Sequence, residues 1–222
     1  MPKNLKKIII YIIGFLLLFI GLIMFMSYRF YNSVFRLSYE QVSTSLESNV
    51  AHCKTIKDCK LIPGDILIRR YVTKITSDFD ESLDPYFTHS AMFLGNDELF
   101  EALGNYEIPV NQIAITKLSS SDWFYDDMHN FVVIRPKKNT EEIKEIISTL
   151  KNIANDPEYV FGPLKEGRKT VSCSDIILKL LLDKKILTKS SSLPQIITPD
   201  YLFWSVVKHG NFEVVGYNIS KK

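Results

Sequence analysis

The stretch that decides the fold is VSCSDIIL, residues 171–178, where a short polar step leads into an apolar helix. Ser172 is a good N-cap, and Asp175 three residues later completes a capping-box pattern. Cys173 is therefore expected at the first helical position, beside unpaired backbone N–H groups and the positive end of the helix dipole. Such a position favours the thiolate, the nucleophilic form of cysteine. Taken alone, Cys173 is more simply interpreted as a small buried residue at the start of a helix. A second segment of the sequence favours the nucleophile instead.

The second segment is THSAMFLGNDELFEALG, residues 88–104, which predicts two strands joined by a Gly-Asn-Asp turn. With a three-residue loop, Glu101 lies opposite Ala91 in the strand pair. His89 and Glu101 are then diagonal neighbours on one face, roughly 7–8 Å apart at the backbone and within side-chain reach. A two-residue loop would instead move Glu101 to the other face.

Glu101 stands between Phe100 and Ala102, and a half-buried carboxylate needs a partner. Taken singly, a Glu at the rim and a hydrogen-bonded core His are the simpler interpretations. Together with Cys173, however, His89 and Glu101 supply a nucleophile, a base and an orienting acid. The sequence therefore predicts a Cys-His-Glu catalytic set.

The order of these motifs resembles a known family. GDILI at residues 64–68, then His89 with an acid twelve residues later, then Cys173, resembles the circularly permuted papain-like fold of the NlpC-type superfamily, in its YiiX-like branch. The family order is His, a polar residue, then Cys, the reverse of papain. The twelve-residue gap also resembles the lecithin retinol acyltransferase-like relatives, which have His where this chain has Glu101. PDYL at residues 199–202 resembles the C-terminal end of the YiiX-like branch, and the resemblance covers about residues 61–216.

Two positions depart from the family pattern. The family often has Glu two residues after the cysteine, where this chain has Asp175. An aromatic-Asp pair often precedes the cysteine, whereas YVFG at residues 159–162 lacks the acid.

The resemblance implies an α+β fold in which an antiparallel sheet packs against the cysteine-bearing helix. It also implies a cysteine hydrolase that cleaves amide or ester bonds in a cell-wall peptide, another peptide or an acylated substrate, without a cofactor. In that chemistry Cys173 attacks the carbonyl, His89 transfers the proton and Glu101 orients the imidazole. Two alternatives stay open: a lipid acyltransferase or phospholipase, and an anchored binding or structural protein without activity.

The N-terminal segment has a different composition. Residues 8–26 form an uncharged apolar run, which as a helix spans about 28 Å, close to the thickness of a bilayer core. Three lysines precede the run, which favours a cytoplasmic N-terminus and a domain on the opposite side of the membrane. We therefore expect a single transmembrane helix in contact with the lipid bilayer, the alternative being a cleaved signal peptide.

Composition and charge limit the possible partners and the number of domains in the rest of the chain. The chain of 222 residues has a net charge of +2, and the part after the apolar run is near −1, with no basic stripe that would indicate a nucleic-acid partner. We expect a cytoplasmic tip and anchor over residues 1–26, a juxtamembrane linker over 27–60 and one globular domain over 61–222.

Three cysteines are present, and two of them lie close together. Outside the cytoplasm, Cys53 and Cys59 would form a local disulfide and leave Cys173 as a free thiol. Two alternatives are a metal site that also uses His52, and two unlinked thiols. His129 and His209 are expected at the surface, and a helix is expected from a cap at Thr140 to about Ala154.

Overall fold

The structure is a computed structural model that describes residues 3–70, 85–103, 112–120, 123, 130–137, 141–162, 167, 169–188, 193–194 and 196–220. The predicted cap at Thr140 and the surface position of His129 lie outside these residues. The chain forms two compact units, Met1–Val34 and Phe35–Lys222.

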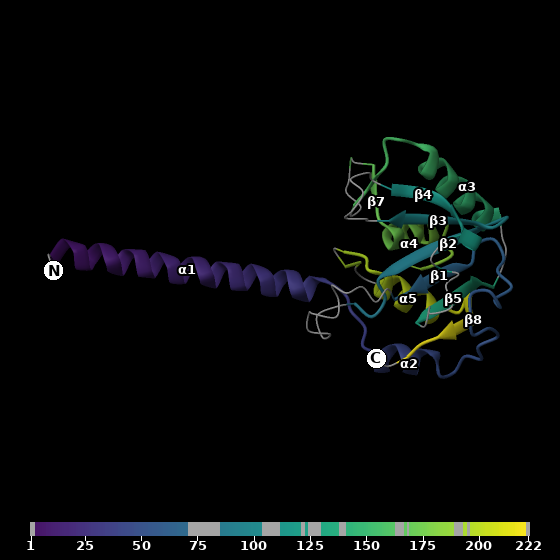
Figure 1. Ribbon diagram of the computed structural model, residues 1–222, viewed down its shortest axis with the longest axis horizontal. Helices are drawn as coiled ribbons and strands as arrows, with labels where there is room; N and C mark the ends of the chain where they lie inside the picture. Colours follow the sequence, from purple (N-terminus) through teal and green to yellow (C-terminus); the bar gives the residue numbers. More distant parts are fainter. Residues whose placement is uncertain are drawn as a thin grey trace. The chain divides into compact units, whose positions relative to one another are not determined.

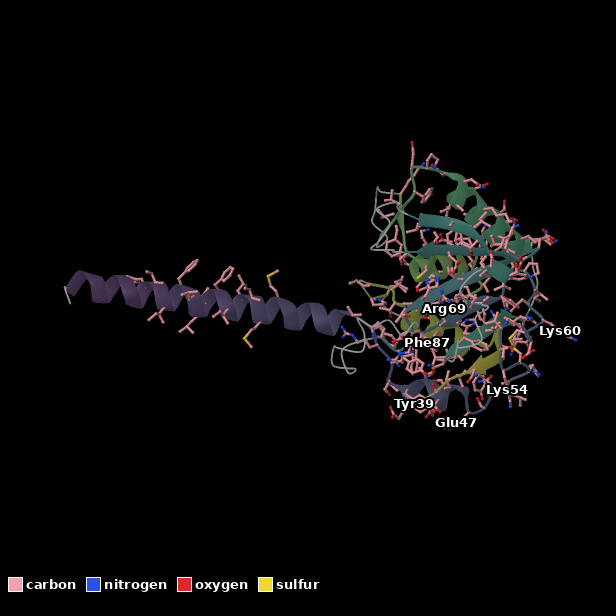
Figure 2. The ribbon with its side chains drawn as sticks, viewed as in Figure 1. Tyr39, Glu47, Lys54, Lys60, Arg69 and Phe87 are labelled. Carbon is pink, nitrogen blue, oxygen red and sulfur yellow. A yellow bond between two sulfur atoms is a disulfide. The ribbon has the colours of Figure 1, made fainter. Side chains whose placement is uncertain are left out.

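The first unit contains helix α1, Lys3–Ser33 (Figure 1). Its side chains over residues 11–26 are all exposed and project outward around the helix (Figure 2). Within the described part of the chain, no helical stretch combines the length and apolarity needed to cross a membrane.

The second unit is built on a six-stranded sheet with the order β4-β3-β2-β1-β5-β8, and every neighbouring pair is antiparallel (Figure 1). The antiparallel sheet of an α+β domain is thus present. The strands are β1 Ile66–Arg69, β2 His89–Gly95, β3 Glu98–Leu103, β4 Gln112–Lys117, β5 Phe131–Pro136 and β8 Phe212–Asn218, with a parallel pair of β6 Val160–Phe161 and β7 Thr170–Val171. The helices are α2 Tyr39–Leu46, the 3₁₀ turn η1 Leu118–Ser120, α3 Glu141–Asn155, α4 Cys173–Asp183 and α5 Pro199–Val207.

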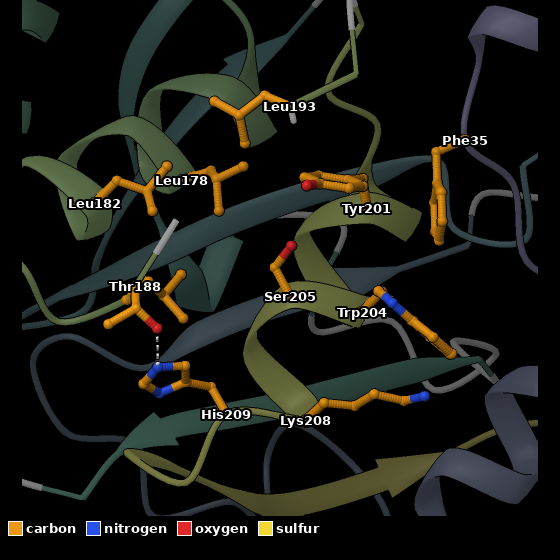
Figure 3. A pocket seen from close by; sticks show the side chains of 11 residues that line it. Phe35, Leu178, Leu182, Thr188, Leu193, Tyr201, Trp204, Ser205, Lys208 and His209 are labelled. Atoms are coloured by element: carbon orange, nitrogen blue, oxygen red, sulfur yellow. Dashed lines mark hydrogen bonds between the residues drawn. The ribbon is translucent and has the colours of Figure 1, made fainter. Parts of the chain in front are cut away.

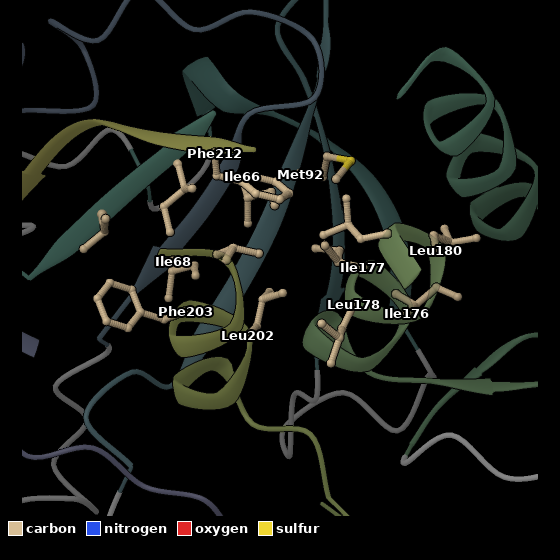
Figure 4. Close-up of a cluster of buried hydrophobic side chains, with 14 of the residues drawn as sticks. Ile66, Ile68, Met92, Ile176, Ile177, Leu178, Leu180, Leu202, Phe203 and Phe212 are labelled. Carbon is tan, nitrogen blue, oxygen red and sulfur yellow. The ribbon is translucent and has the colours of Figure 1, made fainter. Parts of the chain in front are cut away.

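Helices α3, α4 and α5 share one hydrophobic core with one face of the sheet. Ile66, Ile68 and Met92 point from the strands toward Ile177 and Phe203 on the helices (Figure 4). The amphipathic stripe of α3 explains its place there, because its buried residues recur at helical spacing. The cysteine-bearing helix therefore packs on the sheet, as the resemblance implied.

The opposite face of the sheet has a smaller core, which the segment before β1 covers. A disulfide joins Cys53 and Cys59, whose Cα atoms are 5.1 Å apart, and Cys173 is free. Both paired residues are buried in this core. A Cβ at Gly216 on β8 would clash with Cys53 Sγ, so this strand position requires glycine. The predicted pairing is confirmed, and it removes the thiolates on which the alternative metal site depended.

The hairpin between β2 and β3 reaches the predicted register by a different route. Its loop has two residues, Asn96 and Asp97, both with positive φ, as the type I′ turn requires. A bulge between Phe93 and Gly95 adds one residue to β2 and restores the parity of the strand pair. Phe93 pairs with Leu99, which places Glu101 on the predicted face although the predicted three-residue loop is wrong.

A buried carboxylate ties three segments of the domain together. Asp200, at the start of α5, accepts backbone N–H bonds from Leu37, Tyr86 and Phe87 at 2.8, 2.8 and 2.6 Å. Its side chain is fully buried, and burial raises the pKa of Asp200 to about 6 against the opposing effect of these N–H groups. Because Phe87 lies two residues before His89, this clamp fixes the approach to strand β2.

Residues 35–60 belong to the compact domain, although the sequence indicated a linker. Leu37, Val42 and Leu46 are buried in the helix-side core, and Cys53 and Ile56 are buried in the other. The physical reason is that α2 presents a short apolar stripe, capped by Ser38 and Gln41, which the pattern of polar residues obscures.

Candidate active site

The turn from strand β7 into helix α4 positions Cys173. Strand β7 ends at Val171 and leads through Ser172 into α4, so that the cysteine opens the helix. Asp175 accepts the backbone N–H of Ser172 at 2.7 Å, the carboxylate half of the predicted capping box. The Cys173 side chain is almost fully buried and lies near Ser174 Oγ at 3.7 Å. Local sequence alone therefore places the thiol at a helix N-terminus.

His89 and Glu101 form a direct pair across the hairpin. His89 Nε2 lies 3.0 Å from Glu101 Oε1, and both side chains are buried. The Cys173 side chain lies close enough to His89 for the two groups to shift each other's pKa: the imidazole lowers the pKa of the thiol, and the thiol raises the pKa of the imidazole. With Nε2 occupied by Glu101, Nδ1 is the ring nitrogen left for the thiol. The structure thus brings together all three residues that the sequence predicted.

Two further residues hold Glu101, and neither was predicted from the sequence. Trp123 Nε1 donates a hydrogen bond to Glu101 Oε1 at 2.7 Å, and Thr116 Oγ1 donates to Oε2 at 2.5 Å. The ring of Trp123 also lies 5.8 Å from the ring of His89, and the guanidinium of Arg69 covers Trp123 at 4.2 Å. The sequence held one signal for Trp123: it begins the aromatic run Trp-Phe-Tyr between polar residues, and a large aromatic side chain is costly to leave exposed to water.

The electrostatics favour an ion pair between Cys173 and His89. Burial opposes charge on both groups, but their mutual hydrogen bond and opposite charges outweigh it. The pKa of Cys173 falls to about 7 and the pKa of His89 rises to about 9, with Glu101 adding to the second effect. Burial likewise opposes the charge of Glu101, yet its bonds to His89, Thr116 and Trp123 lower its pKa to about 2. Between about pH 7 and 9, thiolate and imidazolium coexist.

This arrangement can perform nucleophilic catalysis. The thiolate can attack an electrophilic carbon, the imidazolium can return a proton, and the carboxylate can stabilise the positive ring. The N–H of Cys173, at the helix start, is a candidate donor to a developing oxyanion.

Trp123→Phe tests whether the tryptophan positions Glu101. Phenylalanine keeps an aromatic ring beside His89 but removes the N–H donor. We expect kcat to fall roughly three- to tenfold with KM little changed, because a hydrogen bond to a charged group is worth about 1.5–3 kcal/mol and relaxation recovers part of it. Steady-state kinetics measure this, and Thr116→Val should give a comparable loss. Unchanged kinetics in both variants would show that Glu101 needs neither donor.

Asp65, from the GDILI motif, has a structural role. Its carboxylate accepts two hydrogen bonds from Arg135, with Nε at 2.9 Å and Nη2 at 2.8 Å, and also accepts the backbone N–H of Ile62. The pair fixes the start of β1 beside β5. His209, predicted at the surface, is part-exposed at the end of α5 and lies outside the site.

Comparison with known proteins finds likeness in structure to solved proteins. No family model matches the chain, and no curated protein matches it. Among solved structures, the chain is similar to the metalloprotein YiiX from Escherichia coli O157:H7, with 12% identity, a TM-score of 0.46, and coverage of 71% of this chain and 98% of that one. In the described part of this chain, no group of three His, Cys, Asp or Glu side chains comes together as a metal site.

Proposed function

We propose that the chain is a cysteine hydrolase that cleaves amide or ester bonds through Cys173, His89 and Glu101. The observation that carries this proposal is the buried contact of a helix-start cysteine with a histidine whose other ring nitrogen is held by a carboxylate. The motif order that resembles the permuted papain-like superfamily, in its YiiX-like branch, supports the same chemistry.

The proposed reaction has two stages. Cys173 thiolate attacks the carbonyl carbon, and the tetrahedral intermediate collapses to an acyl-enzyme as the His89 imidazolium protonates the leaving amine or alcohol. Water then attacks the thioester while His89 accepts its proton, and collapse of the second tetrahedral intermediate breaks the carbon–sulfur bond. This step releases the carboxylic acid and restores the Cys173 thiolate beside the His89 imidazolium. Glu101 keeps the imidazole in one orientation and balances its charge in both stages.

Membrane anchoring is the second part of the proposal. The exposed side chains of residues 11–26 include large apolar groups at every turn, an arrangement that water disfavours and lipid accommodates. The disulfide between Cys53 and Cys59 favours an oxidising compartment for the domain. We propose that the N-terminus is cytoplasmic and that the domain lies on the other side of the membrane.

The pH dependence of alkylation tests the nucleophile. Because the other two cysteines are paired, iodoacetamide should modify Cys173 alone in the non-reduced full-length chain. The lowered pKa of Cys173 means that the rate should rise through about pH 7, more than a unit below the ~8.5 of an ordinary thiol. The urea-unfolded, non-reduced chain is the control and should show the ordinary value. A folded-state midpoint at or above 8.5 would contradict the ion pair.

A trapped adduct tests the reaction. Mass spectrometry of the chain after incubation with a chromogenic ester should locate the acyl group on the peptide that contains Cys173. Transfer of that group to added alcohol or amine rather than to water would favour the acyltransferase alternative. Release of product with no acyl group on Cys173, even after rapid acid quench, counts against covalent catalysis.

A further inference from the structure

One face of the domain combines aromatic rings with a lysine beside an apolar groove. Tyr201 and Trp204 on α5 and Lys208 at its C-cap lie at helical spacing along one side, and Phe35 packs on the two aromatic rings. The ring of Phe35 is 5.2 Å from that of Tyr201 and 6.1 Å from that of Trp204, and Lys208 Nζ lies 3.2 Å from the centre of the Trp204 ring. We call these four residues the aromatic ridge.

The three rings are only partly buried, and Lys208 is exposed. The adjoining groove, of about 420 Å³, runs between α4 and α5 (Figure 3). Its far wall is aliphatic, with Leu182 and the exposed Leu193 facing the ridge. On the other side of Trp204 a second hollow is formed with α2, where Glu40 and Gln41 are among the lining residues.

The short link between helix α1 and Phe35 indicates which surface the aromatic ridge can contact. Phe35 is the first residue of the domain and follows the last residue of α1, Ser33, by two positions. The path from Met26 to Phe35 is therefore at most roughly 17 Å, seven helical steps of about 1.5 Å and two extended ones. If α1 is held in a bilayer, the face that contains Phe35 stays within reach of the headgroup layer.

The composition of the ridge fits that layer. Tryptophan and tyrosine concentrate at membrane interfaces because their rings are apolar at one end and polar at the other. Lysine places its aliphatic stem along apolar surface while its ammonium reaches lipid phosphate. An aliphatic groove beside such residues is likewise compatible with lipid.

We propose that the aromatic ridge docks on the surface of a phospholipid bilayer. The inference rests on the proposed anchoring of α1 and adds to it a second membrane contact, made by the folded domain. Trp204 then lies in the interfacial layer, and Lys208 faces lipid phosphate. The contact restrains the orientation of the domain on the bilayer.

Fluorescence of the full-length chain in phospholipid vesicles tests the docking. The sequence has two tryptophans, and Trp123 is buried within the domain, so subtraction of the Trp204→Phe spectrum isolates the emission of Trp204. Lipids brominated near the headgroup should quench this emission, and lipids brominated near the chain ends should quench it less. Lys208→Glu, at an exposed position, should reduce the quenching without changing the thermal midpoint.

The outcomes separate docking from anchoring and from catalysis. Release of the chain from vesicles by alkaline carbonate would overturn the anchor, and the docking with it. If the chain stays on the vesicles in alkaline carbonate but neither brominated lipid quenches the Trp204 emission, the docking proposal alone is overturned. A Trp204 blue shift that depends on protein concentration rather than on bromine would assign the ridge to a second copy of the chain. Alkylation of Cys173 tests the chemistry independently of all three.

Discussion

Cys173→Ala is expected to abolish turnover while the domain stays folded. Alanine removes the nucleophile but little volume, and it suits a helical position at least as well as cysteine. The loss should be on the order of 10⁴-fold or more, as when a nucleophile is removed from other catalytic triads. Turnover of a chromogenic ester and the thermal unfolding midpoint, followed by circular dichroism, measure the two effects.

Cys173→Ser is the informative companion variant. It keeps the shape of the side chain and a hydrogen-bonding group beside His89, but a hydroxyl is far harder to ionise than a thiol. We expect severe impairment here as well, with a stable fold. If Cys173→Ala retained substantial turnover with a native midpoint, the nucleophile would be elsewhere and the proposed hydrolase mechanism would be wrong.

Glu101→Gln should produce the second largest effect. Glutamine keeps the shape of the side chain and can still hydrogen-bond His89, but it removes the charge that stabilises the imidazolium. We expect kcat to fall by about tenfold or more with a modest effect on folding, by analogy with orienting carboxylates in other triads. Steady-state kinetics at the pH optimum measure the loss, which should appear mainly in the chemical step.

The pH profiles of this variant give the sharper test. Without the carboxylate the pKa of His89 falls, and the thiolate loses part of its counter-charge. The midpoint of Cys173 alkylation should therefore move upward from about 7 toward the ordinary thiol value. An unchanged midpoint together with an unchanged rate would reduce Glu101 to a rim residue and the site to a Cys-His dyad.

The same carboxylate makes stability depend on acid. The folded-state pKa of Glu101, about 2, lies below its unfolded value near 4.3, so its stabilising contribution is present above that value. The contribution is lost as the pH falls from about 4 toward 2. In Glu101→Gln this part of the acid-unfolding profile should be absent.

The positions of the three proposed catalytic residues were predictable because their sequence signals are local. The helix start at Cys173 depends on a cap and an apolar run that adjoin it in the chain. The face shared by His89 and Glu101 depends on strand parity. A three-residue loop and a two-residue loop with one bulge give the same parity, so the correct face followed from an incorrect turn.

Thr116 and Trp123, the residues that hydrogen-bond to Glu101, could not be predicted from local sequence patterns. Thr116 reaches it only because β4 pairs with β3, and the sequence of that strand has no clear alternation. Trp123 is followed by Phe124 and Tyr125, and nothing in this local sequence predicts its contact with Glu101. Such contacts are decided by tertiary packing, which single-residue patterns do not encode.

The segment over residues 35–60 shows the same limit. Its place in the domain depends on Asp200, more than 160 positions from Leu37, and on a disulfide packed against Gly216. Neither partner is visible in the segment itself.

Asp200 also sets the order in which the molecule can mature. The segments that it clamps, at Leu37 and at Tyr86 and Phe87, leave the ribosome long before it does. Strand β8, which completes the sheet beside β5, is synthesised later still. A growing chain that already contains His89, Glu101 and Cys173 therefore lacks the carboxylate that fixes the approach to His89 and the edge strand that closes the sheet. The proposed site is therefore completed only after β8 has been synthesised, so a chain that stops before β8 carries Cys173, His89 and Glu101 without the framework that aligns them.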